Sequence, residues 1–134
     1  MTARRRHLPW LPTALYLALI FYLSSQSDPL PGLTTRVWDK ALHALEYGAV
    51  GGLLLLSLRS SGVGPRLALV LAVAGASLYG LSDELHQAFV PIRSCDVRDW
   101  AADTLGGALG AALAAATLRL REARASIRPV PRRP

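Results

Sequence analysis

The 134-residue chain has room for one domain, with 51% hydrophobic and 18% charged residues. Its net charge is +6, but the arginines stand in short clusters beside apolar runs, which argues against a nucleic-acid interface and is typical of membrane topology signals. The single cysteine, Cys95, excludes an intramolecular disulfide and a multi-cysteine metal site.

Four apolar stretches follow one another along the chain and predict transmembrane helices. They cover residues 8–24, 41–58, 66–89 and 100–118. A helix needs about 20 residues to cross the hydrocarbon core, with about 17 as the lower limit, so the first stretch is marginal. A soluble bundle would need a polar face on every helix, which the runs at residues 53–56 and 67–73 lack.

The first stretch follows a basic cluster at residues 4–6, as the apolar part of a signal peptide does. No small-x-small cleavage site follows, because Tyr22, Leu23 and Gln26 occupy the expected positions. We therefore expect this stretch to remain in the protein as a membrane span.

The basic residues are distributed unequally between the two sides of such a bundle. With four spans, both termini and the turn at residues 60–65 share one side, which carries 11 of the 15 basic residues. The positive-inside rule places that side in the cytoplasm. The sequence thus predicts an all-α, integral membrane four-helix bundle with both termini cytoplasmic.

Proline and glycine mark the connections between the predicted spans. They occur at residues 28–32, after the first span, and at residues 60–65, before the third. The four-helix domain is expected to cover residues 1–118. Residues 119–134 form a basic tail, which we expect to be disordered and to lie in the cytoplasm, resting on anionic headgroups or simply solvated.

The acidic residues gather at the opposite, outer end, and all but Glu122 fall in the outer loops or the outer third of the helices. Each ionisable group in a membrane costs about 2.5–3.5 kcal/mol, so such groups are rarely accidental. At about 100° per residue, three helices each carry a polar stripe. The stripes are Asp39, His43, Glu46 and Tyr47; Tyr79, Asp83, His86 and Gln87; and Asp99 with Asp103. We expect them to face one another, with His43, Asp83, His86 and Asp103 around one shared cavity.

Small residues lie beside these stripes. Ala44, Gly48 and Gly52 occupy the face of the second span opposite its polar stripe, and Gly106 with Gly110 forms a GxxxG pattern on the fourth. Such patterns allow helix backbones to touch in a membrane, so we expect tight packing there.

Four motifs occur in a characteristic order along the chain. They are residues 21–26 (Phe-Tyr-Leu-Ser-Ser-Gln); Asp39-Lys40 with His43 and Tyr47; residues 83–89 with Pro91 and Arg93; and Asp99 and Asp103 before residues 104–106. In this order, over residues 10–118, they resemble the VanZ-like family of small four-span bacterial membrane proteins. Ile92, where the family usually has glycine, and Asp103, where asparagine is common, depart from its pattern.

The resemblance implies a place in the bacterial cytoplasmic membrane and a link to resistance against teicoplanin, a glycopeptide antibiotic with which the family's namesake is associated. It implies no established biochemical activity. The candidate functional cluster comprises Asp39, Lys40, His43, Glu46, Tyr47, Tyr79, Asp83, Glu84, His86, Gln87, Arg93, Asp99 and Asp103.

Three interpretations of this cluster remain open. It can bind a zwitterionic or phosphate-bearing headgroup of a membrane lipid or cell-envelope precursor, with Arg93 as a bidentate phosphate donor. It can be an enzyme, a hydrolase or transferase acting on a lipid-linked phosphate, in which a carboxylate and an imidazole act as general acid and base. It can also be a purely structural set of ion pairs that locks the helices.

The enzyme interpretation includes a divalent metal held by some of His43, Asp83, Glu84 and His86, although no His-Glu-x-x-His spacing is present. Ser82 and Cys95 are weak candidates for a nucleophile. The sequence leaves the ligand, any cofactor and the oligomeric state open, and it predicts no nucleic-acid partner.

Overall fold

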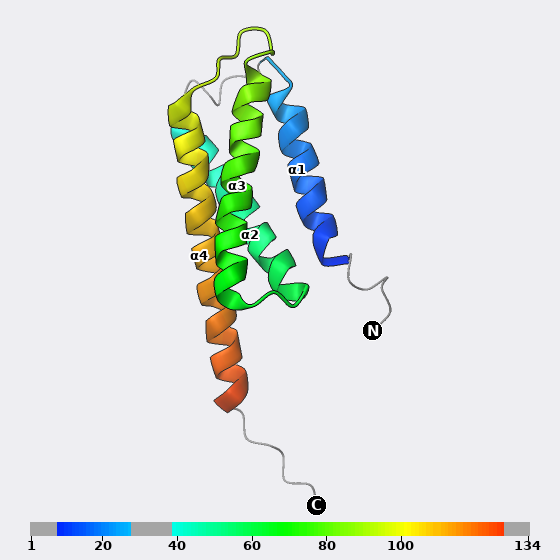
Figure 1. Cartoon of the computed structure of the whole chain (residues 1–134), viewed down its shortest axis with the longest axis vertical. Helices are drawn as coiled ribbons and strands as arrows, with labels where there is room; N and C mark the ends of the chain where they lie inside the picture. Colours follow the sequence, from blue (N-terminus) through cyan, green and yellow to red (C-terminus); the bar gives the residue numbers. More distant parts are fainter. Residues whose placement is uncertain (1–7, 28–38, 128–134) are drawn as a thin grey trace, which may run out of the picture.

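The structure, a computed structural model, describes residues 8–27 and 39–127, which form four α-helices and one short 3-10 helix (Figure 1). The 3-10 turn η2 covers Leu8–Trp10, and the helices are α1 (Leu11–Ser24), α2 (Asp39–Ser60), α3 (Pro65–Gln87) and α4 (Val97–Ile127). The described residues contain no strand, so the all-α prediction is confirmed. The basic cluster at residues 4–6 and the connection at residues 28–32 lie outside the described residues.

Three of these helices, α2, α3 and α4, are long and apolar enough to cross a membrane, judged by length and composition. The helix α1 has only 14 residues, which corresponds to about 21 Å of rise against about 30 Å of hydrocarbon core. The first three residues of the predicted span form the 3-10 turn η2, and the α-helix begins only at Leu11. Pro12 lies in the first turn of α1, and because proline has no backbone N–H, it favours the start of a helix at this point.

The helix α4 is longer than predicted and continues past Leu118 to Ile127. Residues 119–127, predicted as the start of a disordered tail, are therefore helical, and residues 128–134 lie outside the described residues. Arginine, leucine, glutamate and alanine dominate this extension and are strong helix formers. Arg59 of α2 also donates from Nη2 to Glu122 Oε1 at 3.0 Å, which ties the extension to the bundle.

The closest helix pair is α2 with α4, and glycines make the approach possible. A Cβ atom at Gly106 would overlap the carbonyl oxygen of Ala44, and one at Gly110 would overlap that of Gly48. Gly51 similarly faces the backbone of Gly107. The predicted backbone contact at the GxxxG pattern is confirmed, and its partner is the small-residue face of α2.

The interior is built of two clusters along the bundle axis. One comprises Ile20, Tyr47, Val50 and Ala76, and the other comprises Leu55, Ala68, Ala72 and Ala111. Many large apolar side chains instead cover the outside, among them Leu45, Leu78, Leu105, Leu109 and Leu113. An exterior of this kind fits a surface that faces lipid.

The helix α1 lies along α3 and α2 (Figure 1), and hydrogen bonds add to the packing of Ile20 in the first cluster. The hydroxyls of Thr13 and Ser57 lie 2.8 Å apart, and Ser57 donates to Pro9 O. Tyr79 donates from its hydroxyl to Leu17 O at 2.7 Å. These bonds connect the weakest-packed helix to the other three.

Glycine-to-alanine substitutions at two positions of the α2–α4 contact test the importance of backbone approach. We expect Gly110→Ala to destabilise the protein by about 1–3 kcal/mol, because its Cβ has no space against the Gly48 carbonyl. The matched control is Gly52→Ala, whose Cβ would lie at an ordinary 3.6 Å from Gly110 O. Since alanine favours helix over glycine by about 0.5–1 kcal/mol, the control should be neutral or stabilising. Thermal unfolding in detergent measures both, and equal losses would contradict the packing argument.

Candidate functional site

Polar side chains of three helices meet at the end of the bundle where α3 ends and α4 begins (Figure 1). In α2 and α4, His43 Nδ1 and Asp103 Oδ1 lie 2.9 Å apart, and both residues are buried. Three residues earlier in α2, the Lys40 ammonium donates to Asp99 Oδ1 at 2.5 Å and to Asp96 Oδ2 at 3.5 Å. Two successive sets of polar contacts, at His43 and at Lys40, therefore connect α2 with α4.

A glycine of α3 makes room for this arrangement. A Cβ at Gly80 would lie 2.9 Å from Asp103 Cβ and 3.2 Å from Tyr47 Cε1. Asp103 and Tyr47 thus pack against bare α3 backbone. The Tyr47 ring packs between α2 and α3, and its hydroxyl is buried without a hydrogen-bond partner in the described structure.

The carboxylates of α3 organise the loop that follows this helix. Asp83 Oδ2 accepts from Gln87 Nε2 at 3.0 Å, and Gln87 Oε1 accepts from Arg93 Nε at 3.2 Å. Glu84 Oε2 accepts from the backbone N–H of Asp96 at 2.8 Å. The end of α3 therefore fixes both the Arg93 side chain and the start of α4.

Asp96 was outside the predicted cluster, although it belongs to the same network. Its Oδ1 accepts from the backbone N–H of Arg98 at 2.8 Å, and it contacts Lys40. The amide of Arg98, and then Lys40, lower the pKa of Asp96 below its ordinary value. The available signal was the Asp96-x-x-Asp99 spacing at the start of a helix, a capping pattern.

A small cavity of about 70 Å³ lies beside the network, between α1, α2 and α3. Its polar lining is Ser24, His43, Glu46, Asp83, Gln87 and Arg93, and its apolar lining is Ile20 and Leu23. One water needs about 15 Å³ of such volume. The cavity can therefore hold a small charged group together with water.

Five buried side-chain atoms at this end have no hydrogen-bond partner in the described structure. They are Ser24 Oγ, Tyr47 Oη, Asp83 Oδ1, Glu84 Oε1 and Asp103 Oδ2. Buried polar atoms are nearly always bonded to protein, water or an ion. Three of the five are carboxylate oxygens.

The structure brings most of the predicted cluster together, but His86 and Tyr79 lie elsewhere. His86 Nε2 is 3.0 Å from Ser25 Oγ, and its ring packs on Phe21 at 4.7 Å between centroids. The small cavity is lined by His43 and Asp83 but not by Asp103, which packs against His43 and Gly80. Nor does His86 line it, so the expectation of one cavity shared by all four residues is wrong. The reason is that α1 covers the flank of α3 on which His86 lies, whereas Asp83 lies about 60° further round the helix.

Tyr79 bonds to α1 through Leu17 O, with its ring centroid 6.2 Å from that of Tyr47. Asp39 lies with the cluster but is exposed: its carboxylate is 3.9 Å from the Lys40 ammonium and within 4.8 Å of ligand atoms of His43 and Asp99. Of the four predicted metal ligands, His43 and Glu84 lie close together, and their third neighbour is Asp103 rather than Asp83 or His86.

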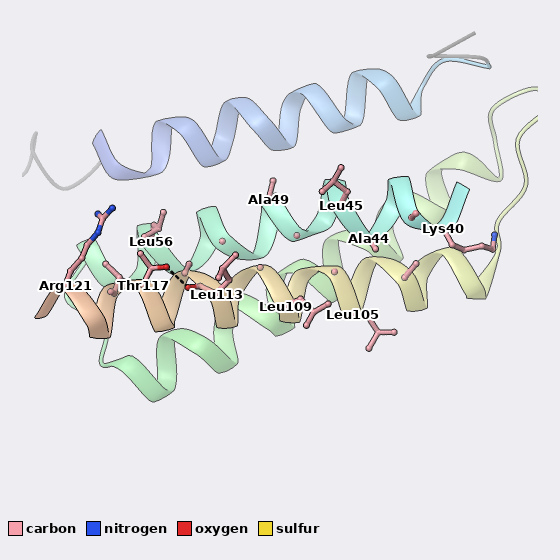
Figure 2. A pocket seen from close by; sticks show the side chains of 18 residues that line it. Lys40, Ala44, Leu45, Ala49, Leu56, Leu105, Leu109, Leu113, Thr117 and Arg121 are labelled. Carbon is pink, nitrogen blue, oxygen red and sulfur yellow. Dashed lines mark hydrogen bonds between the residues drawn. The ribbon is translucent and has the colours of Figure 1, made fainter. Parts of the chain in front are cut away.

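A second concave surface, with a volume of about 1020 Å³, runs along the outside of α2 and α4. Figure 2 shows Lys40 at one end of this outer groove and Arg121 at the other, with leucine side chains between them. Small residues, Ala44 and Gly48 among them, form part of its lining. The polar side chains that line the groove are those of Lys40, Thr117 and Arg121.

Comparison with known proteins agrees with the motifs in the sequence. The VanZ/LLP1 family matches residues 10–119 of the chain. No curated protein and no solved structure shows significant similarity to it. Because the family match covers most of the chain, including every helix that contributes to the polar end, the protein belongs to the VanZ/LLP1 family.

Proposed function

We propose that this VanZ/LLP1 protein is a polytopic membrane protein that binds the headgroup of a zwitterionic phospholipid at its polar end. The observation that carries the proposal is the mixed charge of the small cavity. It is lined by the Arg93 guanidinium together with the Glu46 and Asp83 carboxylates. A lone anion would be repelled by the carboxylates, whereas a phosphate joined to an amine matches both signs of charge.

Arg93 provides the phosphate contact in this proposal. Its Nε donates to Gln87 Oε1, and this bond orients the guanidinium. Among the described residues, its two terminal nitrogens have no hydrogen-bond acceptor, so they can donate to a ligand. A planar guanidinium presents paired N–H donors that match two phosphate oxygens. Gln87 is in turn held by Asp83, so the donor is positioned from α3.

Asp83 and Glu46 provide the amine contact. Asp83 Oδ1 is buried and has no partner in the described structure, and the Glu46 carboxylate lines the same cavity. An ammonium group can donate to both carboxylates and compensate their burial. Because the cavity holds only a small group, the ammonium end enters and the phosphate stays near Arg93 at its edge.

The alternatives explain less of the geometry. A purely structural lock accounts for the His43–Asp103 and Lys40–Asp99 contacts, but it leaves carboxylate oxygens buried and unbonded, which a lock would avoid. For an enzyme, His43 and Asp103 place an imidazole beside a carboxylate, as general acid–base chemistry needs. No described serine is bonded to that pair, and the one described Ser–His contact is Ser25 with His86. Ser25 also bonds to Phe21 O, and no carboxylate is bonded to His86 among the described residues.

We further infer that the protein lies in the bacterial cytoplasmic membrane with both termini inside. The α2–α3 turn and the end of α4 carry Arg59, Arg66, Arg119, Arg121 and Arg124, whereas the acidic network lies at the far end. This asymmetry supports an orientation in which the arginine-rich end faces the cytoplasm. The lipid site would then open to the outer leaflet.

Native mass spectrometry of the full chain with defined phospholipids tests the binding proposal. We expect ethanolamine lipids to bind about tenfold more tightly than glycerol lipids, because only the former carry an amine. Arg93→Ala should weaken binding of every phospholipid at this site by about tenfold. Glu46→Gln should mainly remove the preference for ethanolamine.

Arg98→Ala is the matched control for that experiment, since Arg98 is an exposed cation at the same end of the bundle. It should leave lipid binding within about threefold of the unmodified protein. If Arg93→Ala and Arg98→Ala had equal effects, binding would reflect general surface charge and the proposed site would be wrong.

Orientation is tested with a membrane-impermeant thiol reagent on intact cells. Native Cys95, which is exposed near the start of α4, should react from outside. In a Cys95→Ser background, a cysteine at the exposed Ser60 position should stay unlabelled until the cells are opened. Labelling in the reverse order would move the polar end to the cytoplasm.

A link to glycopeptide resistance is tested in a teicoplanin-susceptible bacterium. We expect expression of the chain to raise the inhibitory concentration of teicoplanin, and Arg93→Ala to abolish the increase at equal membrane abundance. Arg98→Ala should behave like the unmodified protein. Retained resistance in Arg93→Ala would separate the phenotype from the lipid site.

A further inference from the structure

Three buried side chains, one from each of three helices, converge on a point beside the cavity. They are His43 of α2, Glu84 of α3 and Asp103 of α4, and one ligand atom of each lies within 4.8 Å of the others. Glu84 and Asp103 expose only 1% and 0% of their surface, and His43 exposes 9%. Acidic groups this deeply buried require a compensating charge or a proton.

The protein supplies only part of that compensation, through His43, whose Nδ1 lies 2.9 Å from Asp103 Oδ1. Glu84 Oε1 and Asp103 Oδ2 are buried and have no partner in the described structure. Lys40 is bonded to Asp99 and Asp96, so the nearest ammonium is already engaged. Each of the two carboxylates therefore presents a buried, unbonded oxygen.

We propose that His43, Glu84 and Asp103 bind a divalent transition-metal ion, Zn²⁺ or Mn²⁺. One imidazole nitrogen and two carboxylate oxygens form a mixed donor set that suits these ions. With metal–ligand distances of about 2.0–2.2 Å, three donors spaced evenly around one ion lie no more than about 3.8 Å apart. The three ligand atoms here lie within 4.8 Å of one another, so side-chain movements of up to about 1 Å bring them to an ion.

The surrounding hydrogen bonds resemble the supporting contacts of metal sites. Glu84 Oε2 is held by the backbone N–H of Asp96, which leaves Oε1 as the free oxygen. Such outer contacts orient ligands and are costly to remove. A neighbouring triplet, Asp39, His43 and Asp99, is less suitable because Asp39 is exposed and Asp99 is bonded to Lys40.

The proposed lipid contacts, Arg93, Asp83 and Glu46, are not among the metal ligands, and His43 is the one ligand that also lines the small cavity. Lipid binding can therefore be measured in the presence of a chelator, and metal binding can be measured in lipid-free detergent. Failure of one proposal then does not decide the other.

The test uses the full chain, purified in detergent, stripped with chelator and dialysed against Zn²⁺ or Mn²⁺. Metal analysis should find one ion per chain. Glu84→Gln and Asp103→Asn should each weaken binding at least about tenfold, since even outer-shell partners contribute that much. The matched control is Asp83→Asn, another buried carboxylate of α3 with an unpartnered oxygen, which should stay within about threefold.

A spectroscopic readout on the unmodified protein keeps the test valid if a variant fails to fold. Bound Mn²⁺ should show nitrogen coupling from His43 in its electron paramagnetic resonance, and His43→Gln should remove that coupling. The proposal is overturned if the unmodified protein binds no ion or binds one without nitrogen coupling. It is also overturned if Asp83→Asn weakens binding as much as Asp103→Asn, because the ion would then lie in a diffuse acidic cluster.

Discussion

Contact between the backbones of α2 and α4 is the constraint on which the rest of this structure depends. Lipid tails are as apolar as leucine, so helices in a membrane gain little from hiding apolar side chains and rely on close packing instead. Here, Gly106 and Gly110 sit on the carbonyl oxygens of Ala44 and Gly48, with no space for a side chain. This contact fixes both the separation and the register of the two helices.

The register in turn sets the polar end. His43 immediately precedes Ala44, and Asp103 lies one turn before Gly106, so the seated glycines bring His43 to 2.9 Å from Asp103. The same register brings Lys40 to Asp99 one turn further out. Ion pairs in a bundle of this kind are a consequence of the glycine contact as well as a support for it.

The helix α3 joins the pair through Gly80, against which Asp103 and Tyr47 pack. Its next turn adds Asp83 and Glu84, and the number of buried carboxylates then exceeds what Lys40 and His43 can pair. Packing alone has no use for that excess, because each uncompensated charge opposes burial. The lipid and metal proposals both rest on the unbonded oxygens of Asp83, Glu84 and Asp103.

The sequence alone predicted most of the helices and part of the polar cluster. These predictions succeeded where the pattern lies within a single helix. Apolar runs predicted the helices, helical spacing placed His43 and Asp103 on inward stripes, and the GxxxG pattern predicted backbone contact. These inferences need only the 3.6-residue period and the exclusion of polar groups from lipid. The family resemblance was likewise carried by motifs in order, and it is confirmed.

The tertiary structure decided what depends on neighbouring helices. Asp83 and His86 share a stripe in sequence, yet α1 covers His86 and leaves Asp83 at the cavity. Residues that lie about 60° apart on one helix can contact two different neighbouring helices. Their spacing in the sequence does not tell which residue contacts which helix. The place of Asp96 beside Lys40 and the grouping of His43 with Glu84 and Asp103 likewise require the relative rotation of three helices. That rotation is set by glycine contacts between chain segments far apart in sequence, and no local pattern contains it.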